Sequence, residues 1–110
     1  MEIEAATQAF SALAQPARLS TLKLLVKAGP KGAAAGEIAG AIGLPAPTMS
    51  FHLKELERSG LINSRKDGRR VIYAADYGGI RELVDYLLAD CCGGDRRLCG
   101  PYVVIKESVA

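Results

Sequence analysis

Residues 44–62 constrain the fold of this chain more than any other stretch. Met49, Leu53 and Leu56 recur at the spacing of one helix face, so the segment predicts a helix with a single buried side. Its opposite side carries Phe51 among polar and basic residues, which is unusual on a solvated helix. The pattern therefore indicates a helix that packs with one face and contacts a partner with the other.

A shorter helical segment precedes this one at residues 34–42, and a tight turn at Gly43 joins the two. Two helices joined in this way form a helix-turn-helix, which we place at residues 34–60. The second helix of such a motif fits the major groove of DNA, where Phe51 can touch a thymine methyl and Lys54 lies on the same outer face. The alternative is a core helix whose outer face is simply solvated.

Directly after this motif the sequence changes to the alternation of β-strands. Residues 61–66 and 70–74 form two short strand patterns, joined at Asp67-Gly68, a pair typical of hairpin turns. Basic residues gather at the tip of the hairpin: Arg65, Lys66, Arg69 and Arg70. A basic hairpin after a helix-turn-helix predicts the wing of a winged helix, here residues 61–75, whose charges can reach phosphates. The alternative is an edge hairpin kept soluble by its charge.

Length, composition and charge limit what else the chain can be. At 110 residues, 49% of them hydrophobic, it predicts one small domain whose modest core favours dimerisation. The net charge of +2 is too low to prove a nucleic-acid partner, so the clustering of basic residues carries that inference. No window resembles a membrane span or a signal peptide. We therefore expect a cytoplasmic protein without a membrane partner, whose thiols stay reduced.

Helical patterns also flank the motif on both sides. The chain opens with a helix at residues 1–14, and a second helix begins at Pro16 and runs to about Ala28. The expected buried side of the second helix is Leu19, Leu22, Leu25 and Val26. The last helix, residues 79–92, carries a regular apolar seam of Ile80, Leu83, Val84, Leu87 and Leu88.

The apolar seam of the last helix needs a partner. The first helix covers part of it in our interpretation, and the rest meets its copy across a two-fold axis. A two-fold dimer implies a palindromic operator, because the two recognition helices then enter successive major grooves of double-stranded DNA.

Three cysteines lie within nine residues after the apolar seam: Cys91, Cys92 and Cys99. An odd, clustered set does not resemble a disulfide framework. Arg96 and Arg97 would help to hold the sulfurs as thiolates, the form that binds metal ions. Three thiolates without a nearby histidine suit a soft, thiophilic ion such as trivalent arsenic or antimony. Zinc usually takes a fourth ligand. The adjacent pair could instead close a vicinal disulfide, or a cysteine could simply be buried as a small apolar residue.

These features together resemble the ArsR/SmtB family of metalloregulatory repressors. The resemblance covers nearly the whole chain and rests on the L-x-x-P-x-R-L pattern at residues 13–19, on residues 47–56 and 59–62, and on the wing. It implies a mainly α winged helix-turn-helix of about five helices plus a two-stranded hairpin. It also implies a two-fold dimer with the first and last helices at the interface, including Phe10 and Leu13.

The resemblance also assigns side chains to the DNA. Thr48, Ser50, Phe51 and His52 match positions that face DNA in the family. The helical wheel places His52 nearer the core flank, so a structural role at the boundary of the core is an equal expectation.

The cysteine-bearing tail, residues 93–110, is similar to that of one arsenite-responsive branch. The resemblance implies a repressor of an arsenic-resistance operon that needs no cofactor to bind DNA. As(III) or Sb(III), bound by Cys91, Cys92 and Cys99, would act as the inducer. The alternatives are a sensor of cadmium, zinc or lead and a thiol redox sensor. We expect no enzyme, because a thiol-dependent reductase would need a C-x-x-C pair or a catalytic histidine.

Three features of the sequence depart from the family pattern. Pro45-Ala46 stand where many members have Ser-Gln, which removes an expected helix cap and a contact to DNA. Residues 33–37 hold no sulfur, which excludes the arsenite site that the family places at the start of the third helix. His52 is the only histidine, which excludes the family's two-histidine zinc site on the last helix. Only the carboxyl-terminal cysteines remain as ligands.

Overall fold

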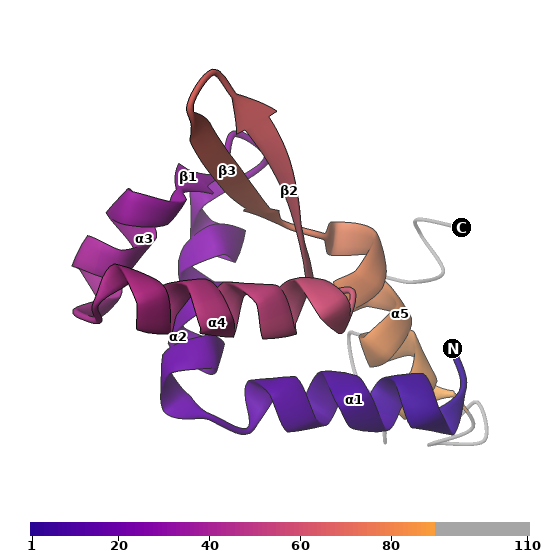
Figure 1. Cartoon of the computed structure of the whole chain (residues 1–110). Helices are drawn as coiled ribbons and strands as arrows, with labels where there is room; N and C mark the ends of the chain where they lie inside the picture. The colour runs from indigo at the N-terminus through magenta and orange to yellow at the C-terminus, as the bar shows by residue number, and fades with distance from the viewer. Residues whose placement is uncertain (90–110) are drawn as a thin grey trace.

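A computed structural model describes residues 1–89, which form five helices and one three-stranded sheet. In chain order the elements are α1 (Ile3–Leu13), α2 (Pro16–Ala28), β1 (Ala33–Ala34), α3 (Ala35–Ile42), α4 (Ala46–Arg58), β2 (Ile62–Asp67), β3 (Arg70–Ala75) and α5 (Tyr77–Leu88). In Figure 1 the hairpin of β2 and β3 projects from the helices, α4 crosses in front of α2, and α1 runs along the opposite side. The predicted winged helix-turn-helix is confirmed.

The starts of the helices follow from local side-chain chemistry. The Gln15 side chain accepts hydrogen bonds from the backbone N–H groups of Ala17 and Arg18, which caps α2. Asp76 caps α5 in the same way, through a 3.0 Å bond from the N–H of Gly79. The predicted last helix therefore begins two residues too late, and its residues 90–92 lie outside the described residues. Helix α4 begins after Pro45 without a side-chain cap, as the departure from Ser-Gln predicts.

The core lies where α4 crosses α1, α2 and α3. Met49, Leu53 and Leu56 are each no more than 1% exposed, which confirms the predicted buried face of α4. Burying a side chain of this size contributes roughly 1.5–3 kcal/mol, so these three fix the rotation of α4 about its axis. None of the helices in residues 1–89 has the length and apolar character needed to span a bilayer.

The α2 interface differs from the prediction. Leu19 and Val26 are exposed at 47% and 44%, whereas Thr21 is fully buried beside Leu22 and Leu25. The Thr21 hydroxyl donates to the carbonyl of Ala17 at 2.7 Å, so a polar residue can occupy the core side without an unpaired group. The predicted buried face was wrong because apolar residues, Leu19 and Val26, also lie on the exposed side of α2.

The sheet contains one strand more than the predicted hairpin, in the order β1-β3-β2. Strand β1 pairs antiparallel with β3, and its two residues are too few to show an alternating pattern in the sequence. Asp67 pairs with Arg70, so the hairpin turn is Gly68-Arg69, one residue beyond the predicted position. Gly68 adopts a φ of 64°, a conformation that favours glycine.

A backbone contact fixes the start of α5. A Cβ atom added at Gly79 would overlap the carbonyl oxygen of Gly60, in the turn between α4 and β2. The N–H of Asp76 also donates to the carbonyl of Leu61 at 2.9 Å. Helix α5 therefore leaves the sheet directly against the end of α4, with no side chain between the two backbones.

Candidate nucleic-acid interface

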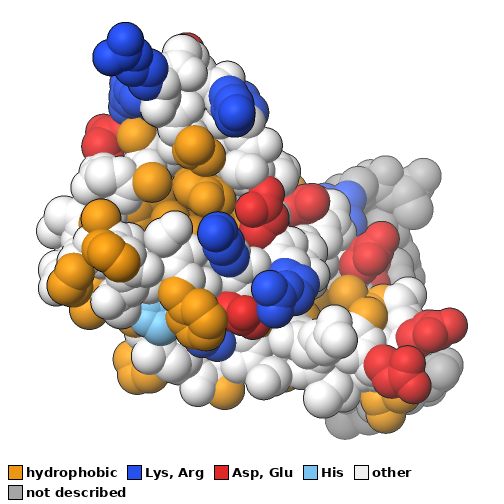
Figure 2. All heavy atoms as spheres, viewed as in Figure 1, with side chains coloured by type: hydrophobic (Ala, Val, Ile, Leu, Met, Phe, Trp, Pro, Cys, Tyr) orange, Lys and Arg blue, Asp and Glu red, His pale blue; other side chains and the backbone are white. Residues whose placement is uncertain are grey.

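The outer face of α4 is exposed where the sequence predicts contact with DNA. Thr48, Ser50, Phe51 and Lys54 all have exposed side chains, and Phe51 is 55% exposed. They lie opposite the buried face, because the tight packing of Met49 and its neighbours orients the helix. Figure 2 shows this side of the molecule. Lys and Arg side chains lie at the tip of the projecting hairpin and also near the middle of the molecule.

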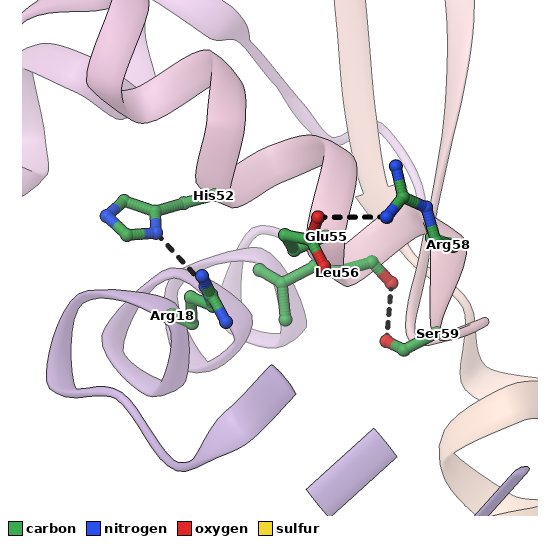
Figure 3. A network of polar contacts seen from close by, with 6 residues as sticks. All are labelled: Arg18, His52, Glu55, Leu56, Arg58 and Ser59. Atoms are coloured by element: carbon green, nitrogen blue, oxygen red, sulfur yellow. Dashed lines mark hydrogen bonds and ion pairs between the residues drawn. The ribbon is translucent and has the colours of Figure 1, made fainter. Parts of the chain in front are cut away.

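His52 belongs to the core rather than to this outer face. It is 7% exposed, and its Nδ1 accepts a 3.0 Å hydrogen bond from Nε of Arg18 on α2 (Figure 3). The structure therefore favours the boundary role over direct contact with DNA.

Sequence reasoning named Arg18 only as part of a motif and missed its contacts with α4. Its Cζ atom lies 5.5 Å from the centroid of the Phe51 ring, and the rings of Phe51 and His52 meet edge to face with centroids 5.9 Å apart. Arg18 and His52 are 34 residues apart, so no local pattern could have paired them.

The four basic residues of the wing fall into two pairs. The Arg65 guanidinium donates to the carbonyl of Lys31 at 2.8 Å, and Arg70 forms an ion pair with Glu37 at 2.9 Å. Within residues 1–89, the exposed side chains of Lys66 and Arg69 form no ion pair or hydrogen bond. The structure therefore leaves the second pair free for phosphates and uses the first pair to brace the wing.

Glu37 joins the wing to the helix-turn-helix. The same Oε1 atom that pairs with Arg70 accepts a 3.0 Å hydrogen bond from the backbone N–H of Ala34, at the start of α3. Sequence reasoning missed this role, because nothing near Glu37 in the chain marks its partner.

Acidic residues on α4 are engaged within the protein. Glu55 pairs with Arg58 at 3.1 Å, and Glu57 accepts a 2.6 Å hydrogen bond from the hydroxyl of Ser64 on β2 (Figure 3 shows the first contact).

Burial raises the pKa of the Tyr73 phenol, and the charge of Glu57 raises it further. Tyr73 therefore stays neutral at physiological pH, and its buried side chain belongs to the core.

The predicted dimer face is split between two environments. Leu83 is 5% exposed, and Leu13 and Ile80 pack partly buried against the same core. The exposed members are Phe10, Val84 and Leu87, at 40%, 41% and 54%, while Leu88 is half-buried. Leu83 therefore lies in the part of the seam that its own chain covers, and its predicted place at a dimer interface stays a prediction. The exposed trio is the part available to a second copy.

The three cysteines, Cys91, Cys92 and Cys99, lie outside the described residues. In residues 1–89, no group of three or more His, Cys, Asp or Glu side chains could hold a metal ion. The predicted thiolate site therefore stays a prediction.

Comparisons with known proteins agree with this geometry. A model of a helix-turn-helix domain matches residues 13–65, from the end of α1 into β2. Among curated proteins, the chain is 33% identical over 86 residues to a probable mercury resistance operon repressor of Streptomyces lividans, covering 78% of this chain and 65% of that one.

Solved structures extend the similarity to the fold. An ArsR family transcriptional regulator, RHA00566, is 31% identical, with a TM-score of 0.69 over 82% of this chain and 89% of that one. A homodimeric winged helix-turn-helix DNA-binding domain, Mb0332 of Mycobacterium bovis, is 29% identical, with a TM-score of 0.66 over 80% and 81%. With its fold, exposed α4 face and basic wing, the chain belongs to the ArsR family of transcriptional regulators, which are DNA-binding proteins and not enzymes.

Proposed function

We propose that this protein is a homodimeric repressor that binds a palindromic operator and is released by trivalent arsenic or antimony. The observation that carries the proposal is the exposed outer face of α4 beside the two free cations of the wing. Helix α4 enters the major groove, where Ser50 and Phe51 meet base edges. Lys66 and Arg69 neutralise phosphates beside the groove, which contributes affinity and little sequence information.

Dimerisation supplies the two-fold symmetry of the operator. Phe10, Val84 and Leu87 leave apolar side chains exposed on α1 and α5, and a second copy that covers them removes this surface from water. The similar Mb0332 domain is homodimeric, which supports the same assembly here. Two copies of α4 would then read two half-sites of a palindrome.

The cysteines support a thiophilic inducer. Cys91 and Cys92 follow α5 by a few residues, and Cys99 lies farther along the chain. An ion that draws their thiolates together would change how α5 meets its partner, and so the spacing between the two copies of α4. DNA and inducer then weaken each other's binding reciprocally. A mercuric-ion sensor is the second candidate, because the similar Streptomyces protein is named a probable mercury resistance repressor and mercury is also thiophilic.

A binding titration tests the proposal. Purified reduced protein is added to labelled fragments from the region upstream of its own gene, and arsenite, antimonite, mercuric and cadmium ions are added separately. We expect tight binding that arsenite and antimonite reverse, and Cys99→Ser should block the reversal while leaving DNA binding intact. Absence of DNA binding at low salt would refute the repressor function. Release by peroxide alone, with no effect of any ion, would replace the metalloid sensor with a redox sensor.

A further inference from the structure

Arg18 connects α2 with the outer edge of α4. Its Nε donates to the buried Nδ1 of His52 at 3.0 Å, and its Cζ lies 5.5 Å from the centroid of the exposed Phe51 ring (Figure 3 shows the first contact). One guanidinium thus joins a core residue of α4 to the residue beside it on the outer face. An arginine on the surface can stay solvated without either of these two contacts.

The Arg18 side chain is restrained at its backbone and at its Nε atom. The backbone N–H of Arg18 lies in the capped first turn of α2, where Gln15 accepts from it through its side chain at 3.3 Å and its carbonyl at 3.0 Å. At the far end, His52 is 7% exposed and is confined by the packing of α4. A planar group with a fixed base and a fixed donor nitrogen can adopt few orientations. The ring of Phe51 therefore meets a cation whose position is set by the core.

Phe51 needs such support if it reads DNA. Its side chain is 55% exposed, so packing against the core cannot hold it by itself. A side chain that recognises a base edge discriminates best when its orientation is fixed before binding, because ordering it afterwards costs affinity. The cation beside the ring and the edge-to-face contact with His52 at 5.9 Å both restrict the ring.

We propose that Arg18 is a positioning residue for Phe51, and that it sets the sequence discrimination of the protein without itself contacting a base. This inference rests on the proposed DNA-binding function and deepens it. It assigns a specificity role to α2, outside the recognition helix and the wing.

The first test needs no DNA. The chain has two phenylalanines, so protein labelled with 4-fluorophenylalanine gives two ¹⁹F NMR signals, and Phe51→Leu identifies the one from Phe51. Arg18→Lys keeps the charge but loses the planar group, and we expect it to move the Phe51 signal and leave the Phe10 signal in place. Arg81→Lys, at an exposed site on α5, is the matched control and should move neither. An unmoved Phe51 signal in Arg18→Lys would overturn the inference.

The second test measures discrimination between DNA sequences. For the parent and Arg18→Lys, affinity is measured for the operator fragment and for the same fragment with single base pairs changed. We expect Arg18→Lys to reduce the ratio of the two affinities about tenfold, the loss of one base contact, with an unchanged salt dependence. In a Phe51→Ala background, the same substitution should reduce the ratio no further.

The outcomes separate the roles that Arg18 could have. An equal loss in the Phe51→Ala background, or a salt slope about two units smaller per dimer in Arg18→Ala, would show a direct contact with DNA and refute positioning. A lower melting temperature with unchanged discrimination would show a structural role alone. A parent that binds no DNA refutes the proposed function and the role of Arg18 with it, whereas the remaining results refute only this inference.

Discussion

The wing and the α1–α5 end of the molecule each contain a set of like residues that the fold divides in two. In the wing, the carbonyl of Lys31 binds Arg65 and Glu37 binds Arg70, while Lys66 and Arg69 have no ion pair or hydrogen bond within residues 1–89. At the other end, the α5 seam sends Leu83 into the core of its own chain and leaves Leu87 and its exposed neighbours uncovered. One surface offers charge and the other offers apolar area, so they suit different partners: phosphates and a second copy. Residue type identifies all the basic residues of the wing and all the apolar residues of the seam. Tertiary contacts decide which of them remain available to a partner.

The largest effect should distinguish the two halves of the α5 seam. Leu83→Asp buries an unpaired carboxylate, and we expect it to lower the free energy of unfolding by more than about 3 kcal/mol. Leu87→Asp places the same charge on a residue that is 54% exposed, so it should leave the protein folded but monomeric. Thermal unfolding by circular dichroism and sedimentation velocity check the two outcomes. Equal unfolding of both variants, or a dimeric Leu87→Asp protein, contradicts the division of the seam.

A second prediction concerns the contact that starts α5. Gly79→Ala should destabilise the protein by about 1–3 kcal/mol, because its Cβ would overlap a backbone carbonyl that cannot easily move. Gly78→Ala is the matched control: its nearest neighbour would be a side-chain oxygen of Asp76 at 3.4 Å, an ordinary contact. Urea denaturation of both variants measures the difference. The close approach of the backbones is wrong if the two alanine variants are equally stable.

The wing can be divided by its salt dependence. We expect Lys66→Ala combined with Arg69→Ala to reduce the slope of log affinity against log salt by about four units per dimer, because each protomer loses two phosphate contacts. Arg65→Ala combined with Arg70→Ala removes the same charge and should reduce the slope by less, since these residues already have partners in the protein. Fluorescence anisotropy at several salt concentrations gives both slopes. Identical slopes for the two double variants would show that bracing does not withhold charge from DNA.

The smallest effect should come from Glu37→Gln. The amide oxygen can still accept from the N–H of Ala34, while the ion pair with Arg70 is lost. Because this pair is exposed, we expect stability to fall by less than about 1 kcal/mol. The Arg70 side chains released in the two protomers should increase the salt slope by up to about two units per dimer, measured by the same anisotropy titrations. A variant that binds DNA more weakly than the parent would mean that Glu37 positions Arg70 for the phosphate.

The sequence predicts the elements that have a strong period. Met49, Leu53 and Leu56 define the buried side of α4 because they lie on one face, and the alternation after Gly60 predicts the hairpin. The two residues of β1 are too few to show a period, and the Arg18–His52 bond joins distant parts of the chain. The division of the wing cations into two pairs could not be predicted from the sequence either. Arg65 meets the carbonyl of Lys31, and Arg70 meets Glu37, only in the folded protein.

The close contact between Gly60 and Gly79 is a point about which α5 could rotate, and it lies directly after the end of α4. From Gly79 to its last residue, Leu88, helix α5 is about 14 Å long. A sideways movement of about 2 Å at its far end corresponds to a rotation of roughly 8° about the glycine contact. Because no side chain lies between the two backbones, we expect such a rotation to act on the turn that ends α4. We therefore expect the angle at which α4 meets DNA to depend on the position of the carboxyl end of α5.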